Sequence, residues 1–403
     1  MNYCLAIDIA KSKSTFALFN SNVSSIVIEP VDIVHSLENL LSLHSNLIKF
    51  GISNISVILE STSTYHLPIV NFFKDRNYQV IVINPLISKE HKRTLRKTKT
   101  DKLDCFILAD IYFKGDYNKQ SSFDNKYEEM QYISRYLITL EHNLVRIKNR
   151  FRQLIGLTFP EYGTIFNNNS LFDEINLNFI YHYPHAEIVS NKRIDALTNT
   201  LFSYYNRHYN YYANKAKFIK SMASNSLTSV STDSIVCNQI KELALFIISE
   251  QKHLVDLKQQ LIDLCKDDKL FNVCLSFDGI SYLTAAYLCA ELKDISRFSS
   301  YKKLIASCGL DPTIIESGKS INYHGPISKR GNRISRKRLF NIIVNIVTVY
   351  SKHHIDNEFV IYYRKKRSEG KHHYAAIIAC STKLLRKIFI DLTTLLFVVK
   401  PYL

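Results

Sequence analysis

The chain has 403 residues, and its 52 Lys and Arg outnumber its 36 Asp and Glu to give a formal net charge of +16. Only 10 Gly and 8 Pro are present and 46% of the residues are hydrophobic, which excludes collagen-like, low-complexity and wholly disordered chains and predicts about two to three folded domains. The charge favours a polyanionic partner such as nucleic acid, because Lys and Arg that neutralise phosphates release condensed counterions. Codon bias in an AT-rich genome, with its abundant Asn, Ile, Lys and Tyr, explains the same excess without a function.

Signals for export, membranes and bound metal clusters are missing from the sequence. The first twenty residues have no basic region followed by an apolar run, and no window approaches about eighteen uninterrupted apolar residues. The eight cysteines are scattered without a CxxC pair, which argues against a zinc ribbon or a disulfide framework. We therefore expect a cytoplasmic protein with no membrane partner and with reduced, mostly buried thiols.

The first part of the chain alternates predicted strands with predicted helices. Leucines at helical spacing predict a helix over residues 31–50, and a short amphipathic helix is predicted over 68–75, before a turn at Asn84 and Pro85. Apolar and β-branched runs predict strands at 3–9, 15–19, 55–59 and 79–83. This order is typical of an α/β layer domain, which we assign to residues 1–120.

Two long helices are predicted in the middle of the chain, over residues 127–157 and 234–264. Apolar and aromatic residues lie at helical spacing in both, as Tyr132, Tyr136, Leu140, Leu144 and Ile147 in the first, and as Ile247, Leu254, Leu257, Leu261 and Leu264 on one face of the second. An antiparallel coiled-coil arm and an ordinary helical bundle explain this pattern equally well. We assign residues 121–270 to the arm and to an Asn- and Tyr-rich insertion, whose tyrosines suit stacking on RNA bases or reflect codon bias.

The remaining residues, 271–403, are predicted to be mostly helical. Gly279 and Ile280 open a helix of small and apolar residues, a pattern like that of a helix-hairpin-helix, in which a glycine turn presents backbone N–H groups to a phosphate. A basic loop is predicted over 317–338, followed by an apolar helix over 339–350.

Four carboxylates occupy positions suited to a metal ion. Asp8 and Glu60 each end an apolar strand, whereas Asp101 and Asp104 are three residues apart and share one face of a helix. Such acids, meeting at the edge of a sheet, hold Mg²⁺ with phosphate oxygens as its further ligands. Taken singly, Asp101 suits a helix cap and Asp8 a turn. A basic block precedes the last pair and is expected to contact nucleic acid: Lys89, Lys92, Arg93, Arg96, Lys97 and Lys99.

A serine lies in a second basic stretch. In ESGKS, Ser317 precedes a glycine and a lysine, and a serine attacks phosphorus when cations stabilise the phosphoryl oxygens and a base such as His324 accepts its proton. Ser320 is an alternative nucleophile, and a phosphate-binding turn without chemistry is the other interpretation. No full P-loop precedes the lysine, which disfavours nucleotide hydrolysis. The basic residues here are Lys319, Lys329, Arg330, Arg333, Arg336, Lys337 and Arg338.

Both ends of the chain resemble one family. The segments AIDIAKSK, ILESTSTYHLPIVNFF and VINPLISKEHKRTLRKTKTDKLDCFILADI resemble the RuvC-like (RNase H-like) domain of DEDD-type insertion-sequence transposases related to the Piv invertase. The segments LSFDGISYLTAAYLCAEL, ESGKS and GPISKRGNRISR resemble the C-terminal transposase domain of that family. Most of the middle of the chain is outside this resemblance.

The resemblance implies a prokaryotic, nucleoid-associated recombinase that cuts and rejoins donor and target DNA. It implies that Asp8, Glu60, Asp101 and Asp104 bind Mg²⁺ and that Ser317 links covalently to a DNA phosphate. It further implies guidance by a bridge RNA and assembly as a homodimer or tetramer, with active sites shared between protomers. Two alternatives stay open, namely a Holliday-junction resolvase that uses the same acids with water, and a non-catalytic nucleic-acid-binding relative.

Overall fold

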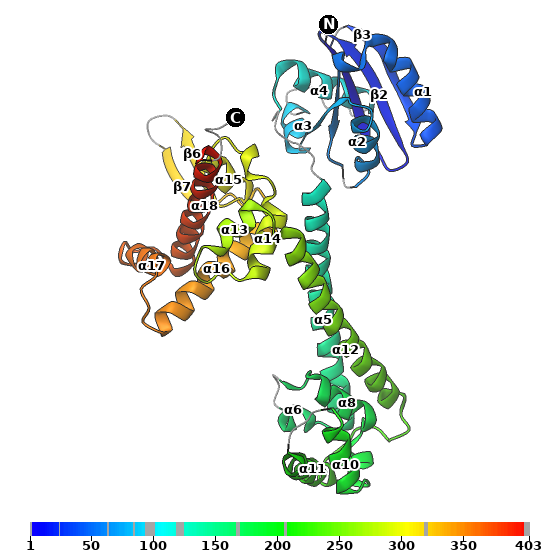
Figure 1. The fold of residues 1–403 in the computed structure, drawn as a ribbon, viewed down its shortest axis with the longest axis vertical. Coiled ribbons are helices and arrows are strands. Elements are labelled where there is room, and N and C mark those ends of the chain that lie inside the picture. The colour runs from blue at the N-terminus through cyan, green and yellow to red at the C-terminus, as the bar shows by residue number, and fades with distance from the viewer. Residues whose placement is uncertain are drawn as a thin grey trace. The chain divides into compact units, whose positions relative to one another are not determined.

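The computed structural model describes residues 2–23, 25–62, 64–83, 85–92, 101–117, 125–166, 170–204, 208–317 and 321–398. The chain divides into two compact units, Met1–Asp124 and Asn125–Leu403 (Figure 1). The first is α/β and the second is mostly helical, which confirms the predicted fold class at that level. The finer division into three segments stays a prediction.

A five-stranded sheet, in the order β3-β2-β1-β4-β5, forms the first unit. Strand β1 pairs antiparallel with β2, which also pairs antiparallel with β3, whereas β1, β4 and β5 run parallel. Parallel neighbours need crossover connections, and the helices α1 and α2 provide them. The strands are β1 (Tyr3–Ile9), β2 (Lys13–Asn20), β3 (Ile26–Val34), β4 (Ile55–Glu60) and β5 (Gln79–Ile83), and the helices are α1 (Leu37–Leu47), α2 (Leu67–Lys74), α3 (Pro85–Lys92) and α4 (Asp101–Lys114).

Each face of this sheet has its own apolar core, because successive side chains of a strand point to opposite faces. On one face, Leu5 and Ile7 of β1 pack with buried residues of α1 and α2. On the other face, Cys4 and Ala6 pack with Cys105 and Leu108 of α4. Whether a residue of β1 or β4 faces α4 therefore depends on its position in this alternation along the strand.

The predicted helix over 31–50 is wrong in its first part, because residues 31–34 end strand β3. The run IVIEPVDIV alternates half-buried and exposed residues, and its proline disfavours a helix interior. Pairing with β2 places Val31 opposite Phe16. The helix begins only after Ser36, whose hydroxyl accepts a hydrogen bond from the backbone N–H of Asn39 at 3.2 Å. The predicted turn residue Asn84 lies outside the described residues.

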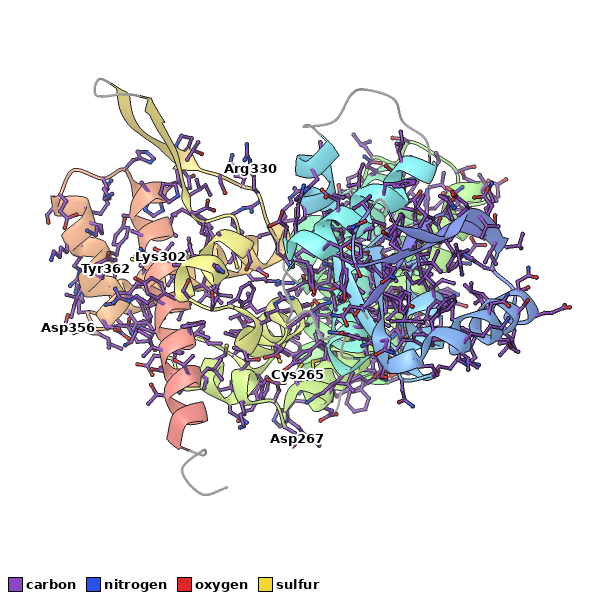
Figure 2. All side chains as sticks on the ribbon, turned by 90° about the horizontal axis from the view of Figure 1, so that it is seen from above. Cys265, Asp267, Lys302, Arg330, Asp356 and Tyr362 are labelled. Carbon is purple, nitrogen blue, oxygen red and sulfur yellow. The ribbon has the colours of Figure 1, made fainter. Side chains whose placement is uncertain are left out.

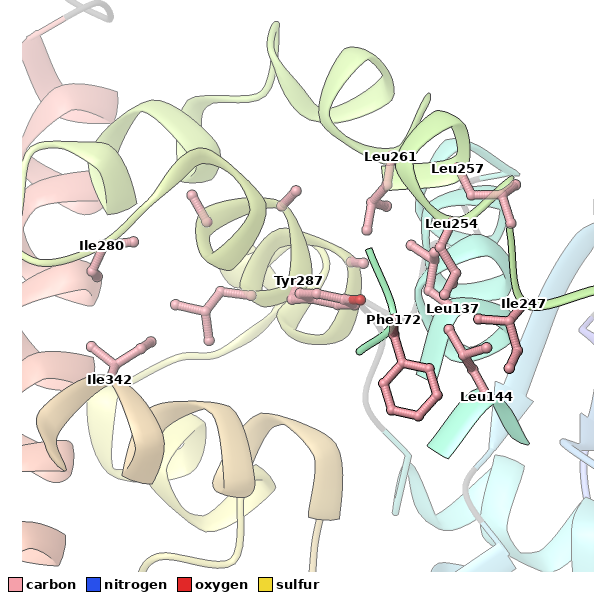
Figure 3. Packing of buried hydrophobic residues seen from close by; sticks show 14 of the residues in the cluster. Leu137, Leu144, Phe172, Ile247, Leu254, Leu257, Leu261, Ile280, Tyr287 and Ile342 are labelled. Atoms are coloured by element: carbon pink, nitrogen blue, oxygen red, sulfur yellow. The ribbon is translucent and has the colours of Figure 1, made fainter. Parts of the chain in front are cut away.

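Two long helices, α5 (Asn125–Thr158) and α12 (Ile235–Cys265), pack against each other in the second unit (Figure 3). Buried residues recur every seven positions in both, as Met130, Leu137, Leu144 and Phe151, and as Ile240, Ile247, Leu254 and Leu261. The stripe predicted for the first helix is confirmed only in part. Leu144 is buried and Leu140 and Ile147 are half-buried, whereas Tyr132 and Tyr136 are 48% and 49% exposed. The stripe of the second helix is confirmed up to Leu261, and Leu264 is half-buried. The coiled-coil arm stays a prediction.

The Asn- and Tyr-rich segment between them is helical and has its own aromatic core. Phe159, Tyr162, Phe166 and Phe179 are buried there, and the Tyr162 hydroxyl donates to the carbonyl of Tyr183. These aromatic side chains therefore stabilise the fold, while Tyr209 and Tyr211 are exposed. The helices are α6 (Tyr162–Ile165), α8 (Glu174–His182), α9 (Ala186–Ser190), α10 (Ile194–Phe202) and α11 (Tyr209–Ser224).

The described part of the chain from Lys269 onward consists of helices and a β-hairpin, which projects from the helices (Figure 1). The elements are α13 (Lys269–Leu275), α14 (Tyr282–Leu292), α15 (Tyr301–Ser307), β6 (Pro312–Ser317), β7 (Ile321–Ile327), α16 (Arg333–Lys352), α17 (Glu358–Ser368) and α18 (His373–Val398). Gly279, at φ +82°, lies between α13 and α14, and the helix-hairpin-helix interpretation of this turn stays a prediction. All eight cysteines are free and buried, as predicted. Among the described helices, none combines the length and apolarity needed to span a membrane.

The predicted loop over 317–338 is confirmed only at residues 328–332, because strand β7 and the start of α16 occupy most of the rest of its described residues. The β-branched residues that flank ESGKS pair as an antiparallel hairpin, with Ser317 opposite Ile321. The helix predicted to begin at residue 339 begins at Arg333, since Asn332 caps it. The backbone of the basic residues 333–338 is therefore held in a helix.

Candidate functional site

Two of the predicted acids lie side by side at one edge of the sheet. Ile7 of β1 pairs with Leu59 of the parallel strand β4, so the next residues along, Asp8 and Glu60, are neighbours at the carboxyl ends of these strands. Side chains two residues apart in a strand point to the same face of the sheet. Asp8 therefore lies on the same face as Ala6, and Glu60 on the same face as Ile58, and both Ala6 and Ile58 belong to the core under α4. The sheet therefore presents both carboxylates on the face that α4 covers.

The start of α4 brings a third acid to the same end of the sheet. The thiol of Cys105 donates to the carbonyl of Thr15 at 3.3 Å, and Thr15 is the register partner of Asp8. Asp104, the preceding residue, is 9% exposed. Asp101 opens α4, but its side chain lies outside the described residues.

The donor chemistry at this edge suits a hard cation, since carboxylate oxygens are the ligands that Mg²⁺ prefers. In the part of the chain that the structure describes, however, no three His, Cys, Asp or Glu side chains gather closely enough to hold a metal ion. The described acids are thus brought to one edge without forming a closed ligand cage.

A buried serine that the sequence analysis missed positions one of these acids. The hydroxyl of Ser88, in α3, donates to Oε2 of Glu60 at 2.7 Å, and Ser88 is 2% exposed. A donor held this way fixes the carboxylate in one orientation. The sequence signal was weak: a serine three residues after Pro85.

Of the basic block before Asp101, Lys89 is exposed at the end of α3. The side chain of Lys92 lies outside the described residues, as do Arg93, Arg96, Lys97 and Lys99 altogether. Their predicted role in nucleic-acid binding stays a prediction.

The predicted nucleophile lies at the end of a hairpin strand. Ser317 is the last residue of β6 and pairs with Ile321 of β7. Its side chain and that of His324 are outside the described residues, as are Lys319 and Ser320. The described geometry thus gives the position of Ser317 in the strand.

Two segments close the base of the hairpin, and we call residues 307–311 and 328–332 the hairpin clamp. The backbone N–H of Asn332 donates to the carbonyl of Ser307 at 2.8 Å. Ser328 donates to Asp311 twice, from its hydroxyl at 2.7 Å and from its backbone N–H at 2.8 Å. The segments pack so closely that a Cβ on Gly331 would lie 2.3 Å from the Ser307 carbonyl oxygen. The hairpin therefore extends from a rigid base.

The basic residues around the clamp divide into two groups. Lys329, Arg330 and Arg333 are exposed, and Figure 2 labels Arg330. Arg336 points inward instead, and its Nη1 donates to the carbonyl of Cys308 at 2.9 Å. Burial raises the pKa of the Cys308 thiol to about 11, which keeps it protonated and unreactive. Arg336 thus serves the clamp in this structure.

A buried acid links the clamp to α5. Glu291, in α14, is 3% exposed, and Arg135 of α5 donates to its two oxygens at 3.2 and 3.3 Å. Nδ2 of Asn332 donates to Oε2 of Glu291 at 2.6 Å, while Oδ1 of Asn332 accepts from the N–H groups of Ile334 and Ser335. Sequence reasoning missed Glu291, although a lone acid in the apolar run YLTAAYLCAEL was a signal.

Comparison with known proteins identifies similar sequences at both ends of the chain. Residues 5–160 match the model of the DEDD_Tnp_IS110 family, described as transposase, and residues 272–357 match the model of the transposase IS116/IS110/IS902 family. Over 147 residues the chain is 28% identical to an insertion element IS110 uncharacterized 43.6 kDa protein of Streptomyces coelicolor, which is 36% of this chain and 34% of that protein. The matched part thus spans about a third of that relative. The first model covers the acidic edge and the second covers the clamp.

Proposed function

Because the chain belongs to the family of DEDD-type IS110 transposases, we propose that it is a DNA transposase that cuts and rejoins DNA to move an insertion sequence. The observation that carries this proposal is the arrangement of Asp8, Glu60 and Asp104 at one edge of the sheet, inside the segment that matches the DEDD model. Acids at such an edge suit phosphoryl transfer, which needs charge stabilisation more than covalent chemistry.

In this proposal Asp8, Glu60, Asp101 and Asp104 hold Mg²⁺. A Mg²⁺ ion held by these carboxylates would supply stabilisation of the negative charge on the oxygens of the scissile phosphate. Ser88 keeps the Glu60 carboxylate in one orientation through its 2.7 Å hydrogen bond. Replacing Asp101 with Asn should abolish the Mg²⁺-dependent reaction, and an unchanged rate would show that Asp101 only caps α4.

We propose Ser317 as the nucleophile. Its Oγ forms a bond to phosphorus, the bond from phosphorus to the leaving sugar oxygen breaks, and the serine proton passes to a base, for which His324 is the candidate. The phosphoserine ester conserves the energy of the broken bond. A sugar hydroxyl of another strand then displaces the serine and joins the DNA without ATP.

The test is a covalent trap. A DNA substrate labelled at the scissile phosphate should leave a labelled protein after denaturation of the wild-type reaction, and Ser317→Ala should lose both the adduct and recombination while DNA binding is retained. Ser320→Ala is the matched control and should retain the adduct. An adduct that is lost only in Ser320→Ala would move the nucleophile by three residues.

A second candidate function is hydrolysis by the DEDD domain alone. The match over residues 5–160 favours it, because a RuvC-like nuclease uses such acids with water and needs no serine. In that case Ser317→Ala would cleave DNA normally and no adduct would form in either protein. The same labelled substrate therefore separates the two functions.

We further propose that a bridge RNA guides the protein and that it acts as a dimer or tetramer, with α5 and α12 as a coiled-coil arm. The seven-residue recurrence of buried residues in both helices supports the arm. Protein purified from cells that carry the whole element should retain a structured RNA encoded beside the gene. Purification without any specific RNA would contradict the guided mechanism.

A further inference from the structure

A basic segment outside every site described above ends α17 and leads into α18. Residues 364–373 read RKKRSEGKHH, with five Lys and Arg against one Glu. The segment lies beyond residue 357, where the match to the second transposase model ends. We call its exposed members, Arg364, Lys365, Arg367 and Lys371, the α17 basic surface.

Acids in the neighbourhood leave this surface positively charged. Glu369 forms an ion pair with Lys366 at 2.7 Å, and Glu358 forms ion pairs with both Lys383 and Lys387 of α18. Arg364 reaches Asp356 only at 3.7 Å, and that carboxylate is 80% exposed, so solvent screens the pair. Within the described part of the chain, Lys365 and Lys371 take part in no ion pair.

Aromatic rings support further cations beside this surface. Lys366 and Lys383 both lie near the ring of Tyr362, with their Nζ atoms 5.2 and 4.9 Å from its centroid. On α18, the Arg386 guanidinium lies 5.0 Å from the ring of Tyr301. Figure 2 labels Tyr362 and Asp356 in this part of the chain. Cations held by rings lose little side-chain entropy when an anion binds.

We propose that the α17 basic surface binds the phosphate backbone of double-stranded DNA without reading its sequence. Its solvent-facing groups are mostly cations, and Tyr362 is half-buried among lysines, which suits the phosphates of a duplex better than the stacked bases of a single strand. The inference rests on the proposed function only in its choice of DNA as the polyanion. It adds a DNA contact remote in sequence from Ser317 and the acids.

The test compares two variants of the full chain that each lose three charges. One is Arg364→Gln/Lys365→Gln/Lys371→Gln, and the matched control is Lys49→Gln/Lys217→Gln/Lys266→Gln, whose exposed lysines are far apart in the chain. Both are made in Ser317→Ala protein and assayed with EDTA, so that binding is measured without cleavage. The binding result can therefore be interpreted even if Ser317 is not the nucleophile. Circular dichroism checks that both variants fold.

Fluorescence anisotropy with a DNA duplex of arbitrary sequence, about 30 base pairs long, gives the affinity at several salt concentrations. The surface variant should bind about tenfold or more weakly at about 0.1 M salt, and the slope of log K against log salt should fall by about two to three, since each lost phosphate contact removes about 0.9. The control should change the slope by less than about one. Equal losses in both variants, or no loss in the surface variant, would overturn the proposal. A loss confined to an RNA duplex of the same length would also overturn it.

Discussion

Single residues fix the close contacts at the hairpin clamp. Gly331 lacks a Cβ where one would meet the Ser307 carbonyl oxygen at 2.3 Å and the Gly309 nitrogen at 2.7 Å. Gly156 is the opposite case, because it lies in α5 with nothing within 4 Å of its Cβ position. The same substitution therefore has opposite effects at the two glycines.

We expect Gly331→Ala to destabilise the second unit by about 1–3 kcal/mol, since backbone atoms must move apart. Gly156→Ala should stabilise it by up to about 1 kcal/mol, because alanine restricts the unfolded chain and favours the helix. Thermal unfolding of both variants beside the wild type measures the two effects. A Gly331→Ala midpoint equal to that of the wild type would mean that the clamp is looser than described.

Ser88 provides the second prediction at this scale. Removal of its hydroxyl in Ser88→Ala frees the Glu60 carboxylate to rotate and should weaken Mg²⁺ binding about tenfold or more, as loss of an outer-shell partner does in metal sites. Isothermal titration with Mg²⁺ in the presence of DNA measures this affinity. Ser45→Ala is the control, because Ser45 is exposed on α1 and bonds only to its own helix. Equal affinities for the Ser88 variant and the control would contradict the positioning role.

Caps and pairing partners decide where the elements begin. The predicted strands at 3–9, 55–59 and 79–83 agree with β1, β4 and β5 to within a residue, because their apolar runs are bounded by polar residues. The errors came where pairing or capping outweighed periodicity: residues 31–34 joined the edge of the sheet, and Asn332 started α16 six residues before its apolar stretch. In α5 the predicted stripe was wrong only at Tyr132 and Tyr136, because apolar and aromatic residues occur on more than one face of this helix.

Asn332 allows a prediction with a built-in control. Asn332→Ala removes the cap of α16 and one donor to Glu291, and should cost about 2 kcal/mol or more. Asn332→Asp retains a capping oxygen but places a second carboxylate 2.6 Å from that of Glu291.

In Asn332→Asp, repulsion between the introduced carboxylate and that of Glu291 should raise the pKa of the pair in the folded state above its value in the unfolded state. The Asp variant should therefore be destabilised at neutral pH and should regain stability relative to the wild type as the pH falls through the raised pKa. The Ala variant should show no such recovery. Thermal midpoints at about pH 5 and about pH 7.5 test this, and parallel curves for the two variants would contradict the contact with Glu291.

The molecule as a whole buries every thiol. All eight cysteines are free and buried, and burial raises the pKa of Cys308 and Cys380 to about 11. Since only the thiolate reacts, we expect no cysteine to react rapidly with a disulfide reagent at pH 8 in the native protein, and all eight to react in denaturant. The absorbance of the thiolate that the reagent releases gives the number of cysteines that have reacted. A thiol that reacts within seconds in the native protein would contradict this packing.

The class of each part of the chain, and the chemistry available to it, can be predicted from the amino-acid sequence alone. Alternating strands and helices predicted the α/β unit, long apolar periodicities predicted α5 and α12, and the motifs at both ends predicted the transposase family that the comparisons identify. These are local properties of the chain, because propensity, periodicity and motif spacing are set by neighbouring residues.

Which distant residues contact each other depends on how the chain packs in three dimensions. The contact between Ser88 and Glu60 joins residues 28 apart in the chain, and the contact between Arg135 and Glu291 joins residues 156 apart. The packing also turns Arg336, a predicted DNA contact, toward the carbonyl of Cys308. Such partners are selected by packing and by the need to satisfy buried polar groups, which no local pattern records.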